Sequence, residues 1–353
     1  MGLEGPFAAH TREAVEQYQW EKKDYEGFAN EVANLLEKAL STRQITYASI
    51  QKRAKDIESF RKKVSKRSGG IPYQPKYPNP LEDIEDLAGI RIITYFLKTV
   101  EEIDKVIYEL FDVKEKQNKG EVLEQAERFG YQSVHYIVSI APEKLKILEM
   151  PRYTGLKAEI QVRTILQHAW AEIEHDIQYK SLETIPNTIH RRFSALAGLL
   201  EIADREFQAI QDDDKQIRVQ ARQSVEENKL EDVEITADAV KAYLDKLLGP
   251  DARVVEGSYD LTASMLHQMG FKDFRGIDEC IVRYVHRDLS SIAWRAKQGQ
   301  VMRFETLLLA ALGKNFILRH PRKNESGFKE KYSQALSRLK QAGIEVGKCK
   351  PVD

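Results

Sequence analysis

Three segments in the first half of the chain alternate apolar and polar residues with the period of a β-strand. They read EDLAGIRIITYF (residues 85–96), GYQSVHYIVSI (residues 130–140) and LKAEIQVR (residues 156–163). Successive side chains of a strand point to opposite faces of its sheet. The polar side chains expected on one face are Tyr131, Ser133 and His135 in the second segment, and Lys157, Glu159, Gln161 and Arg163 in the third. The pattern predicts a sheet with one apolar face and one chemically active face.

Apolar residues at helical spacing surround these strands. Residues 11–40 predict a pair of helices, and residues 45–55 predict an extended segment. Asp56 is expected to cap a helix that ends near Ser65. Further helices are predicted over residues 100–111, 164–179 and 187–223, the second with Ile165, Ala169, Ile173 and Ile177 on one stripe. This order indicates an α+β fold, a mixed β-sheet flanked by helices.

The second half of the chain predicts helices alone. Their expected ranges are 237–248, 261–268, 278–296, 302–311 and 328–342. Charged runs at 212–214 and 226–229 precede this region, and none of its helices carries an evident catalytic cluster. We therefore expect one domain over residues 1–225 and a mostly helical domain over residues 226–353.

Composition narrows the class of protein. A chain of 353 residues has room for two domains, and 54 lysines and arginines against 55 aspartates and glutamates give no overall preference for a polyanion. The two cysteines, Cys280 and Cys349, are too few for a disulfide framework or a thiolate zinc site, which fits a reducing compartment.

No apolar run approaches the roughly 20 residues of a membrane span. We expect a cytoplasmic protein with no membrane partner.

Cations cluster in QKRAKDIESFRKKVSKR, residues 51–67. The junction between the predicted strand and helix carries Arg53, Lys55, Ser59 and Lys63, and the last two lie one turn apart. A polyphosphate over this junction would meet three cations, a hydroxyl and the amides of the first helical turn. A solvated basic surface is the alternative interpretation.

Asp86 and Glu159 are the candidate metal ligands. Magnesium is usually held by one or two protein carboxylates together with phosphate oxygens, so this pair would suffice. The alternatives are a turn cap for Asp86 and a salt bridge with Lys157 or Arg163 for Glu159. Arg91 and Tyr131 could stack on nucleotide bases.

The motifs EDLAGIR, GYQSVH and EIQVRT, preceded by the cationic junction, resemble the synthetase domain of RelA/SpoT alarmone synthetases over about residues 40–180. The resemblance implies a nucleotidyltransferase-like fold, ATP and Mg²⁺. It also implies transfer of the β,γ-pyrophosphate of ATP to a ribose 3′-hydroxyl, with AMP leaving.

The resemblance further implies a role for each matching residue. On the ATP side, Arg53 and Arg91 would sandwich adenine, and the phosphates would be held by Lys55, Ser59 and Lys63. At the reacting centre, Asp86 would bind Mg²⁺, and Glu159 would share the metal or act as general base. On the acceptor side, Tyr131 would stack on the base, and the pocket would be lined by His135 and Gln161.

The acceptor is the open question. Family members that use GDP or GTP usually carry basic residues and a proline before the Gly-Tyr pair, whereas residues 123–129 here read LEQAERF. The chain is more similar to small toxic members that pyrophosphorylate the 3′-terminal adenosine of tRNA and so block aminoacylation and translation. Lys22, Lys23, Lys66 and Arg67 could then bind acceptor-stem phosphates, or could be merely solvated. Synthesis of (p)ppGpp from GDP or GTP is the alternative.

The extra C-terminal region resembles in its arrangement the CapRel fused toxin–antitoxins. That resemblance implies a C-terminal domain that masks the ATP site and is released by a phage capsid protein. Apolar residues such as Trp294, Met302, Phe304 and Phe316 would form the core of this domain or face a partner.

Two other functions are weaker. His175-Asp176 suggests the metal-dependent hydrolase of long alarmone enzymes, but nothing before residue 40 supplies the further histidines and aspartates that it needs. A non-enzymatic nucleotide sensor would have lost a carboxylate or an ATP-binding cation, and none is lost.

Overall fold

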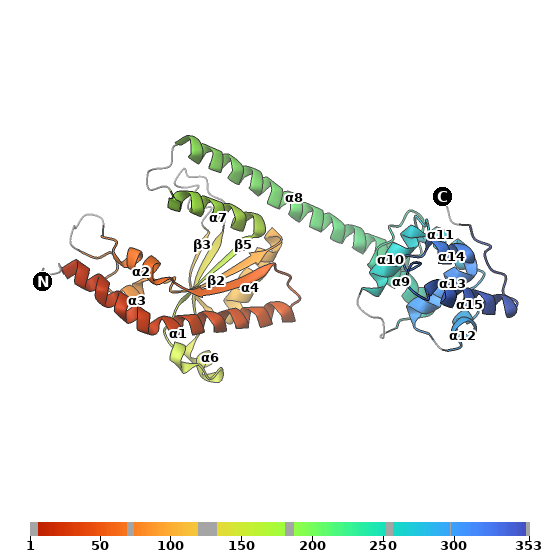
Figure 1. Cartoon of the computed structure of the whole chain (residues 1–353), viewed down its shortest axis with the longest axis horizontal. Coiled ribbons are helices and arrows are strands. Elements are labelled where there is room, and N and C mark those ends of the chain that lie inside the picture. The colour runs from red at the N-terminus through yellow and green to blue at the C-terminus, as the bar shows by residue number, and fades with distance from the viewer. Residues whose placement is uncertain are drawn as a thin grey trace. The chain divides into compact units, whose positions relative to one another are not determined.

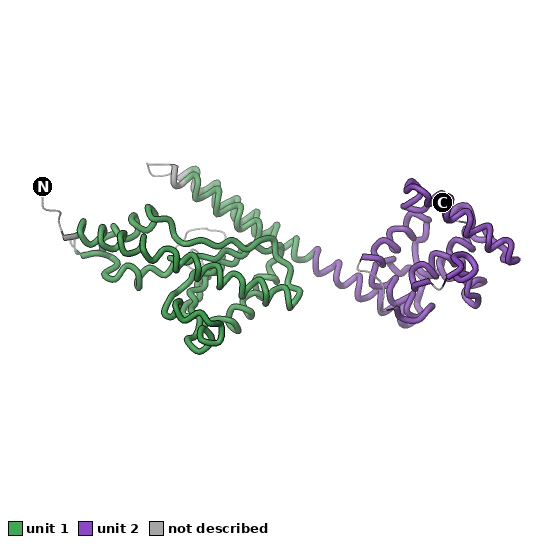
Figure 2. Tube along the Cα trace, turned by 60° about the horizontal axis from the view of Figure 1, so that its bottom comes forward, with its two compact units in different colours: residues 1–209 green, residues 210–353 purple. Residues whose placement is uncertain are grey.

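The structure is a computed structural model that describes residues 6–68, 74–118, 133–180, 187–251, 257–296 and 298–350. It divides into two compact units, residues 1–209 and residues 210–353, coloured separately in Figure 2. The boundary falls inside one long helix, α8 (Asn187–Glu226). Each unit has a hydrophobic core of its own. Among the helices of the described residues, none combines the length and apolar character needed to cross a membrane.

The first unit is an α+β domain, as predicted. In chain order, its first elements are α1 (Pro6–Thr42), β1 (Ser49–Ala54), α2 (Ile57–Val64), α3 (Pro80–Asp83), β2 (Ala88–Thr94), α4 (Leu97–Leu110) and β3 (Asp112–Asn118). They are followed by β4 (Val134–Ser139), α6 (Pro142–Ile147), the 3₁₀ turn η1 (Pro151–Tyr153), β5 (Ala158–Thr164) and α7 (Ile165–Lys180).

The five strands form one mixed sheet in the order β1-β2-β5-β4-β3. The pair β2 and β5 is parallel, and the other neighbouring pairs are antiparallel. The apolar face carries buried residues such as Ile90, Tyr136, Val138, Ile160 and Val162. Helices α1 and α4 cover this face, whereas α7 lies over the other face (Figure 1). The alternation read from the sequence is therefore confirmed.

Residues 6–42 form a single helix, so the predicted helical pair is wrong. The buried stripe of α1 runs without a break from Ala14 to Leu40, which leaves no reason for a turn. Gly27 does not interrupt it but makes room for a neighbour. A β-carbon added at Gly27 would lie 2.4 Å from the hydroxyl oxygen of Tyr153.

The apolar stripe predicted on the helix after β5 does not pack on the sheet. Ile165, Ile173 and Ile177 of α7 are 42%, 57% and 38% exposed. The sheet face under α7 is polar, so this helix turns polar side chains such as Glu172 toward it. Its buried aromatic residue, Trp170, packs instead against Phe193 of α8, with ring centroids 6.3 Å apart.

The second unit is helical in its described residues, as predicted. Beyond α8 its helices are α9 (Ala237–Leu248), α10 (Ser258–Gln268), α11 (Phe274–Ile281), α12 (Leu289–Trp294), α13 (Gln300–Leu312), α14 (Lys314–Arg319) and α15 (Phe328–Gln341). The single helix predicted over residues 278–296 is wrong. α11 ends at Ile281, and Asp288 caps a new helix by accepting the amide hydrogen of Ser291.

The two cysteines lie together in the second unit. Cys280 of α11 and Cys349 of the C-terminal segment form a disulfide, with their α-carbons 5.4 Å apart. The sequence analysis did not predict this bond, because it assigned the chain to a reducing compartment. The number of cysteines also does not show whether two of them lie close together in the fold.

Asp56 caps α2 as predicted, because its Oδ1 accepts the amide hydrogens of Glu58 and Ser59 at 3.0 Å each. We predict that Asp56→Ala lowers the free energy of unfolding, because two amide hydrogens of the first helical turn lose their acceptor. Asp56→Asn, which keeps a capping oxygen, should lose less than half as much. Urea unfolding of the full chain, followed by far-UV circular dichroism, measures both. Equal losses would show that the cap contributes nothing.

Candidate active site

Strand register gathers the polar side chains on one face of the sheet. Directly paired residues of neighbouring strands point to the same face. The pairs that define this face are Arg53 with Gly89, Gln51 with Arg91, Gly89 with Glu159, Arg91 with Gln161, and His135 with Gln161. Four strands thus bring together residues that lie more than 100 positions apart in the chain.

Asp86 lies just before β2 and holds two lysines. Lys55 Nζ donates to its Oδ2 at 2.6 Å, and Lys63 Nζ donates to its Oδ1 at 3.0 Å. Burial raises the pKa of this carboxyl, but the two lysines outweigh burial and hold the pKa below its usual range. Asp86 is therefore ionised at neutral pH and fixes both cations in one place.

Glu159 of β5 accepts two hydrogen bonds from neighbouring side chains. His135 Nδ1 lies 2.8 Å from its Oε1, and Gln161 Nε2 donates to its Oε2 at 2.8 Å. Burial raises the pKa of Glu159, and these two bonds lower it by more, so the net pKa is depressed. The carboxylate is ionised at neutral pH.

Hydrogen bonding around Glu159 orients its partners. An ionised carboxylate only accepts, so His135 donates from Nδ1, and its Nε2 lies 2.9 Å from Ser133 Oγ. On the other side, Arg163 donates to Gln161 Oε1, which turns the Gln161 amide toward Glu159. Burial, with repulsion from Arg91, lowers the pKa of Arg163 to about 10, so it stays charged. The sequence analysis gave Arg163 no such supporting role.

Two cavities meet at Asp86 and Glu159. The first, of about 200 Å³, is lined by Gln51, Lys52, Arg53, Asp86, Gly89, Ile90, Arg91, Glu159 and Gln161. The second, of about 400 Å³, is lined by Lys63, Tyr77, Asp83, Glu85, Asp86, Glu115, Gln117, His135, Ile137 and Glu159. The two carboxylates proposed from the sequence therefore line both cavities. Each cavity is large enough to hold part of a small molecule.

The first cavity holds both arginines assigned to adenine. Arg53 and Arg91 line it from neighbouring strands. Arg91 Nη1 also donates to Glu172 Oε1 of α7 at 2.8 Å and to Gln51 Oε1 at 3.4 Å. Glu172 was missed by the sequence analysis, because nothing in a helical segment indicates which strand residue it will meet.

The second cavity has a strongly acidic wall. Asp83, Glu85 and Glu115 join Asp86 and Glu159 there, against the single cation Lys63 among its described lining residues. Glu85 is paired with Lys157 at 3.0 Å. Glu115 lies on β3, a strand that the sequence analysis missed because its residues, DVKEKQN, show almost no apolar alternation.

The remaining predicted residues lie apart from these cavities or cannot be placed. Ser59 is exposed, and its backbone amide donates a hydrogen bond to Asp56, the N-cap of α2. Lys22 pairs with Glu26 within α1 at 3.7 Å, and Lys23 is exposed. Tyr131 and the acidic stretch at 123–129 lie outside the described residues, as do Gly69 to Pro72 of the predicted loop.

A divalent ion fits the pair of carboxylates. The described residues contain no cluster of three or more acidic, histidine or cysteine side chains that could hold a metal. Magnesium needs only one or two protein carboxylates when phosphate oxygens complete its coordination. The charge of Asp86 raises the pKa of Glu159, so the two groups repel each other across the cavities, and a cation between them would relieve that repulsion.

The fold and the charged sheet face define the protein as an α+β domain with two polar cavities on one face of its sheet, followed by a helical unit. Comparison with known families makes this specific. Residues 52–184 match the family model described as "Region found in RelA / SpoT proteins". The chain therefore contains a RelA/SpoT region, and the resemblance seen in its motifs is confirmed over that range.

Curated relatives match the same part of the chain. GTP pyrophosphokinase YwaC of Bacillus subtilis is 29% identical over 129 residues, which are 36% of this chain and 59% of YwaC. GTP pyrophosphokinase YjbM of the same organism is 26% identical over 161 residues, which are 45% of this chain and 69% of YjbM. This chain thus spans less than two thirds of YwaC.

Solved structures also align with it. A GTP pyrophosphokinase family protein from Streptococcus pneumoniae is 24% identical, with a TM-score of 0.45, over 57% of this chain and 95% of that one. The small alarmone synthetase 1 from Bacillus subtilis is 20% identical, with a TM-score of 0.45, over 57% of this chain and 99% of that one.

The pairing of Asp86 with two lysines makes a testable electrostatic prediction. Lys55→Met should raise the pKa of Asp86, because it removes the first of the two cations that depress it. A depressed carboxyl stabilises the fold above its unfolded pKa, and this contribution disappears as the pH falls through the folded pKa. The variant should therefore lose less stability between neutral and acidic pH than the parent. Carbon-13 NMR titration measures the pKa, with Lys52→Met as control.

Proposed function

We propose that the chain transfers the β,γ-pyrophosphate of ATP to the 3′-hydroxyl of a nucleotide ribose and releases AMP. The observation that carries this proposal is the position of Asp86 and Glu159 between two cavities, one lined by arginines and the other by carboxylates. Such a site can align two substrates on either side of a reacting centre. The RelA/SpoT region and the names of the two relatives support the same reaction class.

In this proposal the 3′-oxygen attacks the β-phosphorus of ATP. The bond between that phosphorus and the oxygen that bridges it to the α-phosphorus breaks, and the oxygen leaves as part of AMP. The proton of the attacking hydroxyl passes to Glu159. The depressed pKa of Glu159 keeps it ionised and able to accept, while His135 and Gln161 hold its two oxygens in place.

The basic residues bind and orient ATP. Lys55 and Lys63 already stand on either side of Asp86, so they can contact phosphate oxygens laid beside it. Arg53 and Arg91 would stack on adenine from two neighbouring strands. Asp86 would hold Mg²⁺, which when bound supplies positive charge to the phosphates and orients them.

Guanine nucleotides are the first candidate acceptor. Both relatives carry the name GTP pyrophosphokinase, and both match the part of this chain that contains the two cavities. The product would then be a guanosine tetra- or pentaphosphate.

The 3′-terminal adenosine of tRNA is the second candidate. The acidic wall formed by Asp83, Glu85 and Glu115 favours it, because these carboxylates would repel the di- or triphosphate of GDP or GTP. A tRNA 3′ end presents a base and a free hydroxyl without a terminal phosphate. Its modification would block aminoacylation and translation, and Lys22 and Lys23 would contact the acceptor stem.

The helical region over residues 226–353 is proposed as a regulatory domain. Its support is the separate hydrophobic core that this part of the chain helps to form. It would inhibit the synthetase domain, residues 1–225, until a partner such as a phage capsid protein binds. A cytoplasmic location is part of the same proposal.

Glu159→Gln tests the reacting centre. The amide cannot take a proton from the attacking hydroxyl, so AMP release should fall by about 10²–10⁴-fold, the usual contribution of a positioned general base. The isosteric change should preserve the far-UV circular dichroism spectrum. Glu102→Gln, an exposed position on α4, is the matched control. AMP release at the parental rate would remove Glu159 from the mechanism.

The acceptor is tested by incubating the full chain with γ-labelled ATP and GDP, GTP or bulk tRNA. Label in a guanine nucleotide supports the first candidate, and label in tRNA alone supports the second. If the acidic wall discriminates, Glu115→Gln should lower the KM for GDP or GTP several-fold, whereas exposed Glu101→Gln should not. Transfer to tRNA should also weaken steeply with added salt.

A further inference from the structure

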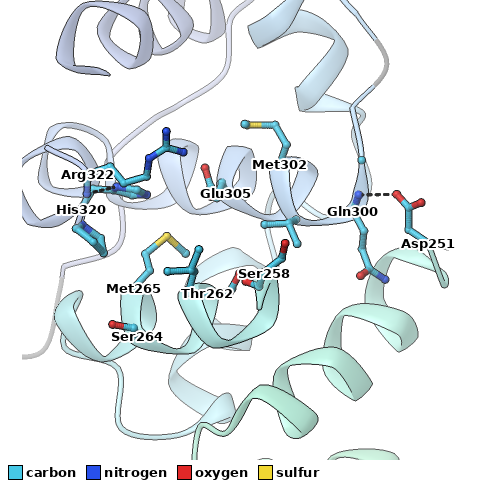
Figure 3. Close-up of a pocket in the computed structure, with 14 residues that line it drawn as sticks. Asp251, Ser258, Thr262, Ser264, Met265, Gln300, Met302, Glu305, His320 and Arg322 are labelled. Atoms are coloured by element: carbon cyan, nitrogen blue, oxygen red, sulfur yellow. Dashed lines mark hydrogen bonds between the residues drawn. The ribbon is translucent and has the colours of Figure 1, made fainter. Parts of the chain in front are cut away.

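The second unit contains a cavity of about 510 Å³, within the usual range of small-molecule sites (Figure 3). It lies between α10, the first turns of α13 and the segment that follows α14. Its apolar lining includes Leu261 and Met265 of α10 and Val301 and Met302 of α13. Methionine side chains adapt to the shape of what they contact. The cavity can therefore surround a small apolar body.

Glu305 of α13 contributes a carboxylate to this cavity. Its Oε2 accepts a hydrogen bond from the Tyr332 hydroxyl at 2.5 Å, and within the described chain its Oε1 receives none. Burial raises the pKa of Glu305 above its usual range, although Tyr332 and the nearby Arg322 oppose that shift. A carboxylate that is largely buried and bound through one oxygen is costly unless a cation or a further donor reaches the other oxygen.

His320 is the second polar group with unused capacity. It lines the same cavity and is 3% exposed. Its Nδ1 accepts the backbone amide hydrogen of Arg322 at 3.0 Å, so the ring proton is on Nε2. Nε2 has no hydrogen-bond partner among the described residues. Burial lowers the pKa of His320 to about 4, which leaves the ring neutral with one unused donor.

The two groups lie close enough to serve one ligand. Tyr332 contacts both, because its hydroxyl binds Glu305 and its ring centroid lies 5.9 Å from that of His320. Figure 3 shows Glu305, His320 and Arg322 gathered on one side of the cavity.

The charged groups of the lining favour a cationic ligand over an anionic one. The Arg322 guanidinium is bound by Glu325, with its Nε 2.9 Å from both carboxylate oxygens. Asp251 accepts the amide hydrogen of Gln300 at 3.0 Å. Each cation and anion on this wall is thus paired except for one oxygen of Glu305. A phosphate or carboxylate would meet that oxygen, and the nearby Arg322 is already bound by Glu325.

We propose that this cavity binds a small organic cation, in which an ammonium group contacts Glu305, a carbonyl or hydroxyl oxygen accepts the Nε2 proton of His320, and an apolar body fills the space between α10 and α13. Such a ligand would satisfy both unused polar groups at once. The site is separate from the candidate active site, because none of its residues lines the two cavities of the sheet.

Calorimetric titration of the full chain without ATP tests this with three matched probes. L-Phenylalaninamide carries the ammonium and the carbonyl, phenethylamine lacks the carbonyl, and 3-phenylpropanamide lacks the ammonium. We expect L-phenylalaninamide to bind and each of the other two to bind about tenfold more weakly, since one charge-assisted or buried hydrogen bond is lost. Absence of binding by L-phenylalaninamide, or equal binding of 3-phenylpropanamide, overturns the proposal.

Two variants locate the binding. Glu305→Gln should remove the preference for the ammonium, so that L-phenylalaninamide and 3-phenylpropanamide bind alike. Leu261→Trp should weaken all three probes, because Leu261 is 72% exposed at the rim and a larger side chain there blocks entry without disturbing the core. Exposed Glu279→Gln on α11 is the control and should change nothing. An unchanged affinity for L-phenylalaninamide in both Glu305→Gln and Leu261→Trp would place the ligand elsewhere.

Discussion

The parallel pairing of β2 with β5 is the constraint on which the candidate active site depends. It sets Gly89 opposite Glu159 and Arg91 opposite Gln161, and so decides which side chains share a face with Glu159. A slip of one residue would send Glu159 into the apolar core and Ile160 to the open face. The slip is prevented because Ile90, Ile160 and Val162 are buried on the core face under α1 and α4. Burial of aliphatic side chains thus fixes the geometry of a charged site.

Charge compensation is the second requirement of this face. Asp86 is held by two lysines, Glu159 by a histidine and a glutamine, and Arg91 by Glu172. These contacts keep Asp86 and Glu159 ionised in a partly buried place where an isolated charge would be costly. Lys55 and Lys63 could exchange Asp86 for a phosphate, because a phosphate also presents negatively charged oxygens that accept hydrogen bonds. The charges of this face are therefore compensated within the described chain.

The sequence predicted those features that follow from local pattern. Strand periodicity gave the two faces of the sheet, and Asp56 marked the start of α2 because capping depends on a single side chain. Long-range pairing was not predictable in this way. Glu172 meets Arg91 across 81 positions, and Cys280 meets Cys349 across 69. β3 was missed because an edge strand with exposed polar residues carries no apolar signal. Proximity, unlike periodicity, is decided by the fold as a whole.

The polar groups beside the cavities of the two units differ in how far they are satisfied within the chain. On the sheet face, Asp86, Glu159 and Arg91 each have side-chain partners. In the helical unit, the hydrogen-bonding capacity of Glu305 and His320 is only partly used by Tyr332 and the Arg322 backbone. A fold normally satisfies such groups or replaces them by apolar ones, because leaving them unmatched costs stability. Their retention beside a cavity is most simply explained if the missing partners come from outside the chain.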